Sequence, residues 1–408
     1  MLRSRRPNPA RALSGLSRVL WAAAVAFVVA AHPAAADVGV VFVANAEDGT
    51  VDVVRAEGDP ADFAVIRSID VIPDGASPSP ANDPLQTAAF PLVVLAGGDN
   101  FAQDLDLSPD GATLYVSRGH LGDVAAFDVR TGAMLWRVPV GGFRADHMTI
   151  SPDGARLFVS AITENEVEVI AVDADPETPG QQPALAGSFP TGDWPHDNHV
   201  SPDGGSLYNG SLGNVLVPPE ARFSPSGELG GVLNEPYRIT KVDAQTLEPL
   251  DTFDFDRGVR PFLLTPDEKL LYAQLSFFHG IVEYDLEEKR IRRTVELPID
   301  EGVTEDDYDF EAPHHGLALS SDGSLLCAAG RASDYVALVS TATMLPVALI
   351  DVDDAPGWAA NGPGGNHCWV ASTRADTVSV ISYATRALVK TIPTGDGPKY
   401  LLAGRIEP

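Results

Sequence analysis

Short apolar stretches alternate with polar turns along most of the chain, and this alternation repeats. The segment Leu107–Ser117 reads LSPDGATLYVS and returns at Ile150–Ser160 as ISPDGARLFVS. Weaker copies of the segment begin at Ser201, Thr265, Ser320 and about Gly362. The shortest spacings give a period of about 42 residues, which is typical of repeat architectures. The longer spacings indicate insertions between strands.

Each repeat predicts four short strands. An apolar strand leads into the SPDG-type turn, an alternating strand follows it, and a third strand such as Val167–Val172 comes after a polar turn. A fourth strand ends near a Thr-Gly or Val-Gly pair. Four short strands per period predict the blade of a β-propeller.

The two ends of the repeat region complement each other. Val38–Asn45 matches the second strand of the other repeats, so the first repeat lacks its innermost strand, while Pro398–Ala403 matches first strands such as Pro261–Thr265. We therefore expect the C-terminal strand to complete blade one and close the ring, which removes an open sheet edge. The prediction is an all-β, seven-bladed propeller of four-stranded antiparallel blades, a single domain over residues 37–408. Insertions are expected near residues 73–100, 214–235 and 303–313.

The last repeat carries a family resemblance. Thr377–Ser382, through Thr391–Gly395, resembles the YVTN-type propeller repeat family, which is related to WD40-like and lactonase-type propellers. The resemblance covers nearly all of residues 38–404. It implies the fold and leaves the function open, because this scaffold hosts lyases, lactonases, redox enzymes and binding proteins.

Residues 1–36 have the layout of a secretory signal. They contain five arginines and no acidic residue, followed by the apolar stretch Val19–Ala31 and then Ala34-x-Ala36. We expect cleavage near Ala36 and a mature protein that is exported, either periplasmic or secreted. Arg5-Arg6 hints at twin-arginine export, but the following Pro7-Asn8-Pro9 favours the general secretory route. No later apolar run reaches 18 residues, so no membrane span is expected in the mature chain.

The charge of the chain excludes several partners. The formal net charge is −29, and removal of the five arginines of the signal leaves 23 basic against 57 acidic residues, or −34. Such a field repels nucleic acids and anionic lipid surfaces. The sequence also lacks a phosphate loop and a GxSxG elbow, which disfavours nucleotide-dependent chemistry.

The chain has two cysteines, Cys327 and Cys368, which align to the second strands of blades six and seven. Export would permit oxidation. A disulfide across the blade boundary and a pair of buried free thiols are both compatible with this spacing, because sequence does not establish the separation of the Cα atoms.

Most histidines map to one face of the predicted propeller. The loop before each innermost strand and the loop between the second and third strands surround the mouth of the central channel. Residues in the first of these positions are His147, His196, His199, His314 and His315, and residues in the second are His120 and His279. Only His367 among the mature histidines falls elsewhere.

These histidines support a first hypothesis, an enzyme that uses a transition metal on a small organic molecule in the channel. Imidazole is the common ligand of copper, zinc, iron and nickel. The predicted ligands are His147, His196, His199, His314 and His315, and copper is the expected ion, by analogy with exported copper enzymes on propeller scaffolds. The alternative is that the histidines form hydrogen bonds that hold neighbouring blades together.

Two other hypotheses need no metal. In one, a lactonase-type or lyase-type enzyme uses His196 or His315 as a general base and Arg260 as an electrostatic anchor. The remaining residues expected along the channel are Asp104, His120, Trp194, Asp197, His279, Glu311, Trp358 and Lys399. In the other, the propeller is a non-catalytic scaffold that binds a ligand or a protein partner through its insertions.

Overall fold

The computed structural model describes residues 37–76, 99–172, 182–213, 215 and 237–407. Within these residues the chain forms seven sheets, each of four antiparallel strands. The predicted all-β, seven-bladed propeller is therefore confirmed. The predicted signal at residues 1–36 lies outside the described residues, as do most of the insertions predicted at 73–100 and 214–235.

Each blade has its innermost strand at the central channel and its fourth strand at the outside. The strands of the first four blades are named here in that order. Blade 1 consists of β28 (Pro398–Ile406), β1 (Val38–Asn45), β2 (Thr50–Arg55) and β3 (Ala64–Asp70). Blade 2 consists of β4 (Asp104–Leu107), β5 (Thr113–Arg118), β6 (Asp123–Asp128) and β7 (Met134–Pro139). Blade 3 consists of β8 (Ala145–Ile150), β9 (Arg156–Ala161), β10 (Glu166–Ala171) and β11 (Ala184–Pro190). Blade 4 consists of β12 (Pro195–Val200), β13 (Ser206–Ser211), β14 (Tyr237–Asp243) and β15 (Pro249–Phe255).

The other three blades follow the same order. Blade 5 consists of β16 (Val259–Leu264), β17 (Leu270–Leu275), β18 (Gly280–Asp285) and β19 (Arg290–Glu296). Blade 6 consists of β20 (Leu317–Leu319), β21 (Leu325–Gly330), β22 (Tyr335–Ser340) and β23 (Leu345–Asp351). Blade 7 consists of β24 (Pro356–Asn361), β25 (His367–Ser372), β26 (Thr377–Ser382) and β27 (Ala387–Pro393). Short 3₁₀ turns are η1 (Pro60–Asp62), η2 (Gly119–Leu121), η3 (Glu305–Asp307), η4 (Asp309–Glu311) and η5 (Pro363–Gly365).

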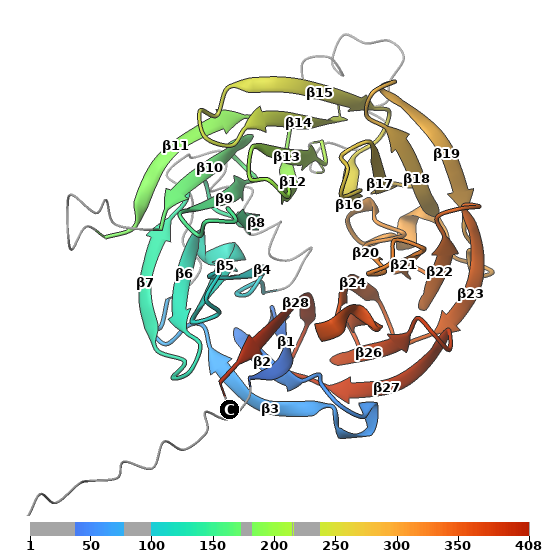
Figure 1. Cartoon of the computed structure of the whole chain (residues 1–408), viewed down its shortest axis with the longest axis horizontal. Coiled ribbons are helices and arrows are strands. Elements are labelled where there is room, and N and C mark those ends of the chain that lie inside the picture. The colour runs from blue at the N-terminus through green and yellow to red at the C-terminus, as the bar shows by residue number, and fades with distance from the viewer. Residues whose placement is uncertain (1–36, 77–98, 173–181, 214, 216–236, 408) are drawn as a thin grey trace, which may run out of the picture. The chain divides into compact units, whose positions relative to one another are not determined.

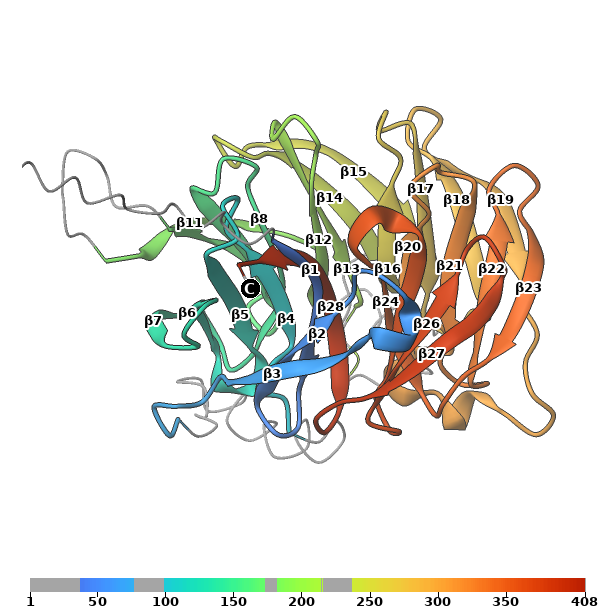
Figure 2. The same cartoon turned by 60° about the horizontal axis from the view of Figure 1, so that its bottom comes forward.

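The blades stand side by side around the channel (Figure 1). Their innermost strands contact one another in the order β28, β4, β8, β12, β16, β20, β24 and back to β28. In Figure 2 the outer strands of neighbouring blades, such as β19 and β23, lie on the outside of this arrangement. The predicted closure by the C-terminal strand is confirmed, because β28 pairs antiparallel with β1 from Val38↔Ile406 onward.

The hydrophobic core lies between blades. The second and third strands of each blade are buried on both faces, so they contain continuous buried runs, such as those of β9 and β10, in which most side chains are apolar. The fourth strands alternate instead, and in β19 only Val295 is buried. Packing of one blade on the next therefore supplies the main hydrophobic stabilisation.

The SPDG motif builds the turn between the first and second strands. In blade 3, Ser151 Oγ donates a hydrogen bond to Asp153 Oδ1 at 2.6 Å, and Asp153 Oδ1 accepts one from Ala155 N at 3.0 Å. Ser151 Oγ also accepts from Arg156 N at 3.0 Å. Gly154 has a φ of +75°, which favours glycine. The repeated motif is thus a local turn that satisfies its own polar groups.

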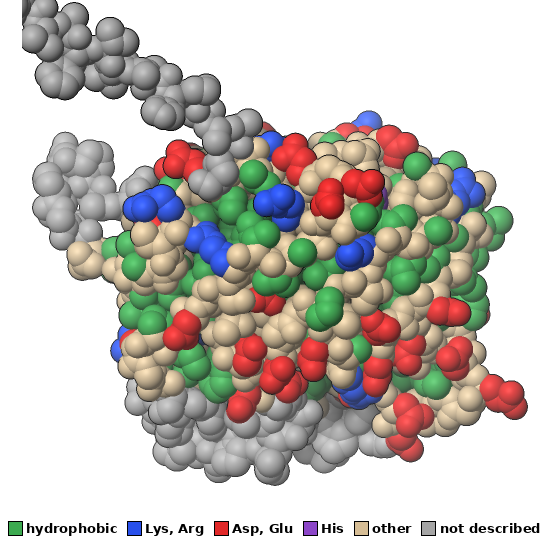
Figure 3. All heavy atoms as spheres, turned by 90° about the horizontal axis from the view of Figure 1, so that it is seen from below, with side chains coloured by type: hydrophobic (Ala, Val, Ile, Leu, Met, Phe, Trp, Pro, Cys, Tyr) green, Lys and Arg blue, Asp and Glu red, His purple; other side chains and the backbone are tan. Residues whose placement is uncertain are grey.

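Acidic side chains recur over the surface drawn in Figure 3, in keeping with 57 acidic and 28 basic residues in the chain. Among the described residues, no helix has the length and apolar character needed to span a bilayer.

Cys327 in β21 and Cys368 in β25 form a disulfide, with their Cα atoms 6.5 Å apart. The structure thus decides between the two alternatives left by the sequence. Both cysteines are buried in the cluster between blades 6 and 7, where Val336, Leu338 and Val370 also pack. The bond joins two neighbouring blades covalently.

We expect the double variant Cys327→Ser/Cys368→Ser to lower the free energy of unfolding by roughly 2–4 kcal/mol, because the cross-link no longer restricts the unfolded chain. The cross-link spans a sequence separation of 41 residues. Urea unfolding followed by tryptophan fluorescence would measure the change. The wild type in excess reductant serves as the control and should show the same loss. Equal midpoints for oxidised wild type and double variant would contradict this expectation.

Candidate functional site

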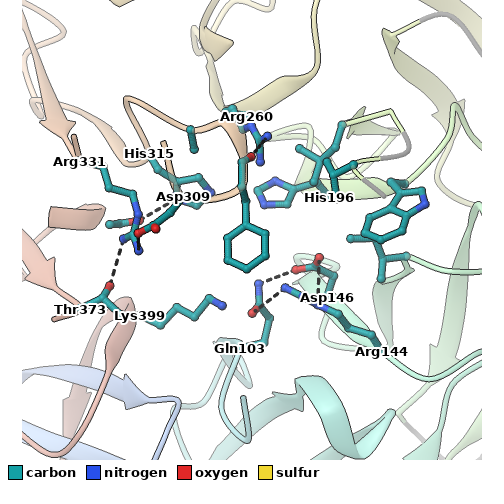
Figure 4. Close-up of a pocket in the computed structure, with 17 residues that line it drawn as sticks. Gln103, Arg144, Asp146, His196, Arg260, Asp309, His315, Arg331, Thr373 and Lys399 are labelled. Carbon is teal, nitrogen blue, oxygen red and sulfur yellow. Dashed lines mark hydrogen bonds and ion pairs between the residues drawn. The ribbon is translucent and has the colours of Figure 1, made fainter. Parts of the chain in front are cut away.

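A cavity of about 200 Å³ lies among the innermost strands and their flanking loops (Figure 4). Its lining comes from all seven blades and consists of Gln103, Arg144, Asp146, Ile162, Trp194, His196, Leu212, Val215, Arg260, Asp309, Phe310, Ala312, His315, Arg331, Gly357, Thr373 and Lys399. The cavity therefore joins apolar walls with several charged groups, which is the usual composition of a small-molecule site.

A recurring β-bulge places the polar groups at the cavity. In β8, Ala145 pairs with Ala161 and Met148 with Val159, so the inner strand carries one residue more than its partner across Asp146 and His147. The same irregularity occurs in β12, β16, β24 and β28. The residues that these pairings skip are His196, Asp197, Arg260, Pro261, Gly357 and Lys399. Bulges re-aim side chains beside functional sites, and here they bring chemistry-bearing residues of several blades to one cavity.

Three of the predicted histidines form one cluster. The ring centroids of His147 and His196 are 4.5 Å apart, and those of His196 and His315 are 5.4 Å apart. Trp358 stacks on His147 with its centroid at 4.7 Å. The convergence is close enough for the three imidazoles to act on one bound molecule.

Hydrogen bonds orient two of these imidazoles. His147 Nδ1 donates to Asp104 Oδ2 at 2.7 Å, and His315 Nδ1 donates to the Gly357 carbonyl oxygen at 2.7 Å. Because the neutral ring has one N–H, each bond leaves a lone pair on Nε2, and in neutral His147 this lone pair faces the Gln103 amide at 3.2 Å. The Nε2 atoms of His147 and His315 are thus the basic or ligating atoms.

The environments of the cluster set different protonation states. Burial places the pKa of His196 well below its usual value, and the positive charge of His147 lowers it further. Burial also places the pKa of His315 well below its usual value. Burial opposes charge on His147 too, but the hydrogen bond and the charge of Asp104 outweigh it and raise the pKa of His147. His196 and His315 are therefore neutral near pH 7.

Three cationic side chains, Arg144, Arg331 and Lys399, also line the cavity and form what we call its cationic wall. Arg144 Nε lies 3.7 Å from Asp146 Oδ2, and Arg331 Nη2 lies 2.9 Å from Asp309 Oδ2. Lys399 Nζ makes no hydrogen bond or ion pair with the described residues. Burial lowers the pKa of Lys399 to about 7, and the charge of Arg144 adds to the shift. This wall has surplus positive potential that a bound anion would offset.

The loop that includes η4 borders the cavity. Asp309 accepts hydrogen bonds from Arg374 Nη2 at 2.7 and 2.8 Å, and the Phe310 carbonyl accepts one from Arg260. Phe310 and Glu311 have φ values of 48° and 68°. Two consecutive non-glycine residues in the left-handed region indicate local strain, which is often found at functional sites.

Five of the predicted site residues line the cavity, namely His196, His315, Arg260, Trp194 and Lys399. Four others, His147, Asp104, Trp358 and Glu311, lie directly behind the lining or against it. His147 is bonded to Asp104 and stacked on Trp358. Glu311 lies against Arg260, with Oε2 at 3.6 Å from Nη2.

The remaining predicted residues lie in other environments. His199 Nε2 is 3.1 Å from Asp197 Oδ2, and its ring packs on Phe262. His314 lies beside His279, with the ring centroids 5.2 Å apart. His120 is buried in η2. The structure therefore groups His147, His196 and His315, but it does not bring His199 or His314 into contact with that group.

The sequence patterns did not predict three further lining residues, Arg144, Arg331 and Gln103. Arg331 follows β21, in the loop between the second and third strands, and Arg144 directly precedes β8. These are the positions that placed the histidines at the channel mouth. The same positional rule applied to arginine and glutamine would have found them.

A family model described as Lactonase, 7-bladed beta-propeller matches residues 30–191. Among solved structures, the chain is similar to a candidate 6-phosphogluconolactonase from Bacteroides fragilis, with 15% identity, a TM-score of 0.64, and coverage of 91% of this chain and 100% of that chain. It is also similar to the hydrazine synthase of Kuenenia stuttgartiensis, with 18% identity, a TM-score of 0.44, and coverage of 70% and 96%. No curated protein matches the chain. The predicted resemblance to lactonase-type propellers is thus supported by the family match over residues 30–191 and by the seven-bladed fold.

Proposed function

We propose that the protein is an exported enzyme that opens the lactone ring of a small organic anion in the central cavity. The observation that carries the proposal is a shared cavity: the neutral imidazoles of His196 and His315 line it together with the guanidinium group of Arg260. Addition of water to a carbonyl group requires a base that takes a proton from the water and is accelerated by a cation that stabilises the oxyanion.

His315 is the best-placed general base. Its Nδ1–H donates to the Gly357 carbonyl oxygen, so Nε2 is the atom that would accept a proton from the attacking water and return it to the ring oxygen as the acyl C–O bond breaks. The charges of Arg260 and Arg331 contribute to its lowered pKa. A bound anion would offset those charges and raise the basicity of His315 in the complex. His196, beside it, is the alternative base.

Arg260 would stabilise the oxyanion that forms when water attacks. Its Nε donates to Ser276 Oγ at 3.0 Å, and its Nη2 donates to the Phe310 carbonyl oxygen. The side chain is buried and therefore held in place before the substrate binds. A preorganised cation in a site with little water stabilises developing negative charge strongly.

Arg144, Arg331 and Lys399 would hold an anionic group of the substrate, such as a carboxylate or phosphate. In Figure 4 Lys399 and Arg144 lie across the cavity from Arg260. The match of residues 30–191 to the lactonase family supports the reaction class. The candidate 6-phosphogluconolactonase with the same fold is named for a phosphorylated lactone, which is one substrate of this kind.

A copper-dependent reaction is the second candidate. The observation that favours it is the convergence of His147, His196 and Asp146, whose possible ligand atoms all lie within 4.8 Å of one another. This reaction would require a bound ion, whereas lactone opening by His315 and Arg260 does not. Activity after treatment with a chelator therefore separates the two candidates.

We expect lactones that carry a carboxylate or phosphate group to be hydrolysed, with acid release measured in a pH-stat. His315→Ala should lower kcat by about 10²- to 10⁴-fold, since it removes the general base. Arg260→Ala should lower kcat by about 10²- to 10³-fold, since it removes an oxyanion donor. His367→Ala, outside the cavity, is the control and should retain activity. No activity on any member of the panel would refute the proposed reaction.

We also expect sulfate to bind in the cavity with an affinity that falls as the pH rises from 6 to 8. The pKa of Lys399 is about 7, so its charge is present below pH 7 and lost above it. One titrating group would give a decrease of about three- to tenfold over this range. Titration calorimetry at several pH values would measure it, and Lys399→Met should bind more weakly and without this pH dependence. An unchanged pH dependence in the variant would assign the titration to another group.

A further inference from the structure

We propose that one divalent transition-metal ion binds at the floor of the cavity, which we define by the lining residues Asp146 and His196 and by His147 directly behind them. One ligand atom from each residue lies within 4.8 Å of the others. All three residues are buried, with exposed fractions of 1%, 4% and 0%. Lactone opening by His315 and Arg260 does not need this ion, so the site is independent of that reaction and deepens only the second, metal-dependent candidate.

One separation between the ligand atoms is close to that of a metal complex. His147 Nε2 lies 3.7 Å from Asp146 Oδ1. Ligands bonded at about 2.0–2.2 Å to a tetrahedral ion lie roughly 3.3–3.6 Å from each other. The His147–Asp146 pair is therefore already near the ligand spacing of a bound ion, and the His196 ligand atom lies within 4.8 Å of both.

The side-chain amide of Gln103 lies between two of the proposed ligand atoms, His147 Nε2 and Asp146 Oδ1. Its amide Nε2 lies 3.2 Å from His147 Nε2 and donates a hydrogen bond to Asp146 Oδ1. One donor group thus serves two acceptors that belong to the proposed ligand set. An ion would take over both acceptors, and the Gln103 amide would move aside.

The outer contacts of His147 match those of a metal ligand. Asp104 Oδ2 accepts the Nδ1–H of His147 at 2.7 Å and also accepts a hydrogen bond from Met148 N at 3.0 Å. A carboxylate behind a histidine fixes the tautomer and ring orientation and makes Nε2 a better ligand. The buried Asp104 thus orients His147 toward the proposed ion.

Two ligand-type atoms are buried without hydrogen-bond partners among the described residues, His196 Nδ1 and Asp146 Oδ2. Buried polar atoms are nearly always satisfied in folded proteins. The His196 ring otherwise contacts the rings of His147 and His315, and Asp146 forms ion pairs with Arg144 and His147 and accepts a hydrogen bond from Gln103 at Oδ1. The unsatisfied atoms point to a ligand at this place.

The chemical types of the three proposed ligands determine which class of metal ion the site would bind. Two imidazoles and one carboxylate suit zinc, iron(II) or copper(II), whereas magnesium and calcium prefer oxygen ligands. Three protein ligands leave an open coordination position. In Figure 4 Asp146 and His196 border the same cavity as His315, so that position would face the substrate.

The first test is metal binding by the purified full chain without a histidine tag. The protein is stripped with a chelator and titrated with Zn²⁺ in competition with a chromophoric chelator. We expect one equivalent to bind. His196→Gln and Asp146→Asn should each weaken binding by at least 100-fold, and Asp104→Asn by about 10- to 100-fold. Circular dichroism would establish that each variant is folded.

His199→Ala is the matched control, since His199 lies in the same strand as His196 and contacts Asp197 instead of the cluster. It should bind Zn²⁺ within about threefold of the wild type. Electron paramagnetic resonance of the Cu²⁺ form should show two nitrogen ligands in the wild type and one in His196→Gln. No stoichiometric binding, or an equal loss in His199→Ala and His196→Gln, would overturn the site. Lactone hydrolysis by the chelator-treated protein is scored separately, so failure of the metal site and failure of the proposed reaction are distinguishable.

Discussion

The pairing of β1 with β28 is the constraint on which the ring depends. The two strands come from opposite ends of the propeller and pair antiparallel from Val38 to Asn45. Without this pairing blade 1 would have no innermost strand, and β1 would present an open edge. The closing strand also carries Lys399 into the cavity and Tyr400 against Trp358. One set of backbone hydrogen bonds thus completes both the fold and the site.

Ring closure fixes where the innermost strands begin, and the bulges then direct their side chains. A regular strand sends alternate side chains to opposite faces. An extra residue changes this alternation locally, so neighbouring residues such as Asp146 and His147 can both serve the same region. The repetition of this device in several blades explains how a symmetric scaffold supports an asymmetric group of bases, cations and carboxylates.

The cavity differs electrostatically from the rest of the protein. The chain has a formal charge of −29, yet Arg144, Arg260, Arg331 and Lys399 line one small cavity. Buried carboxylates, Asp104 and Asp146, lie beside His147 at the floor. The cationic wall favours an anionic substrate, while the floor combines carboxylates with imidazoles. In our proposals, anion binding by the cations and metal binding by His147, His196 and Asp146 therefore use different side chains of one cavity.

The repeat period, the incomplete first repeat and the strand-like C-terminus determined the propeller, its seven blades and its closure, because these features are local or periodic in the sequence. The same period predicted that the histidines face the channel mouth. Tertiary structure alone decided that His147, His196 and His315 meet while His199 packs on Phe262, since a bulge sets which way each side chain points. It also decided the disulfide between Cys327 and Cys368 and the partners of Arg144 and Arg331. These contacts join residues of different strands and loops, and their distances depend on how blades pack, which no single repeat encodes.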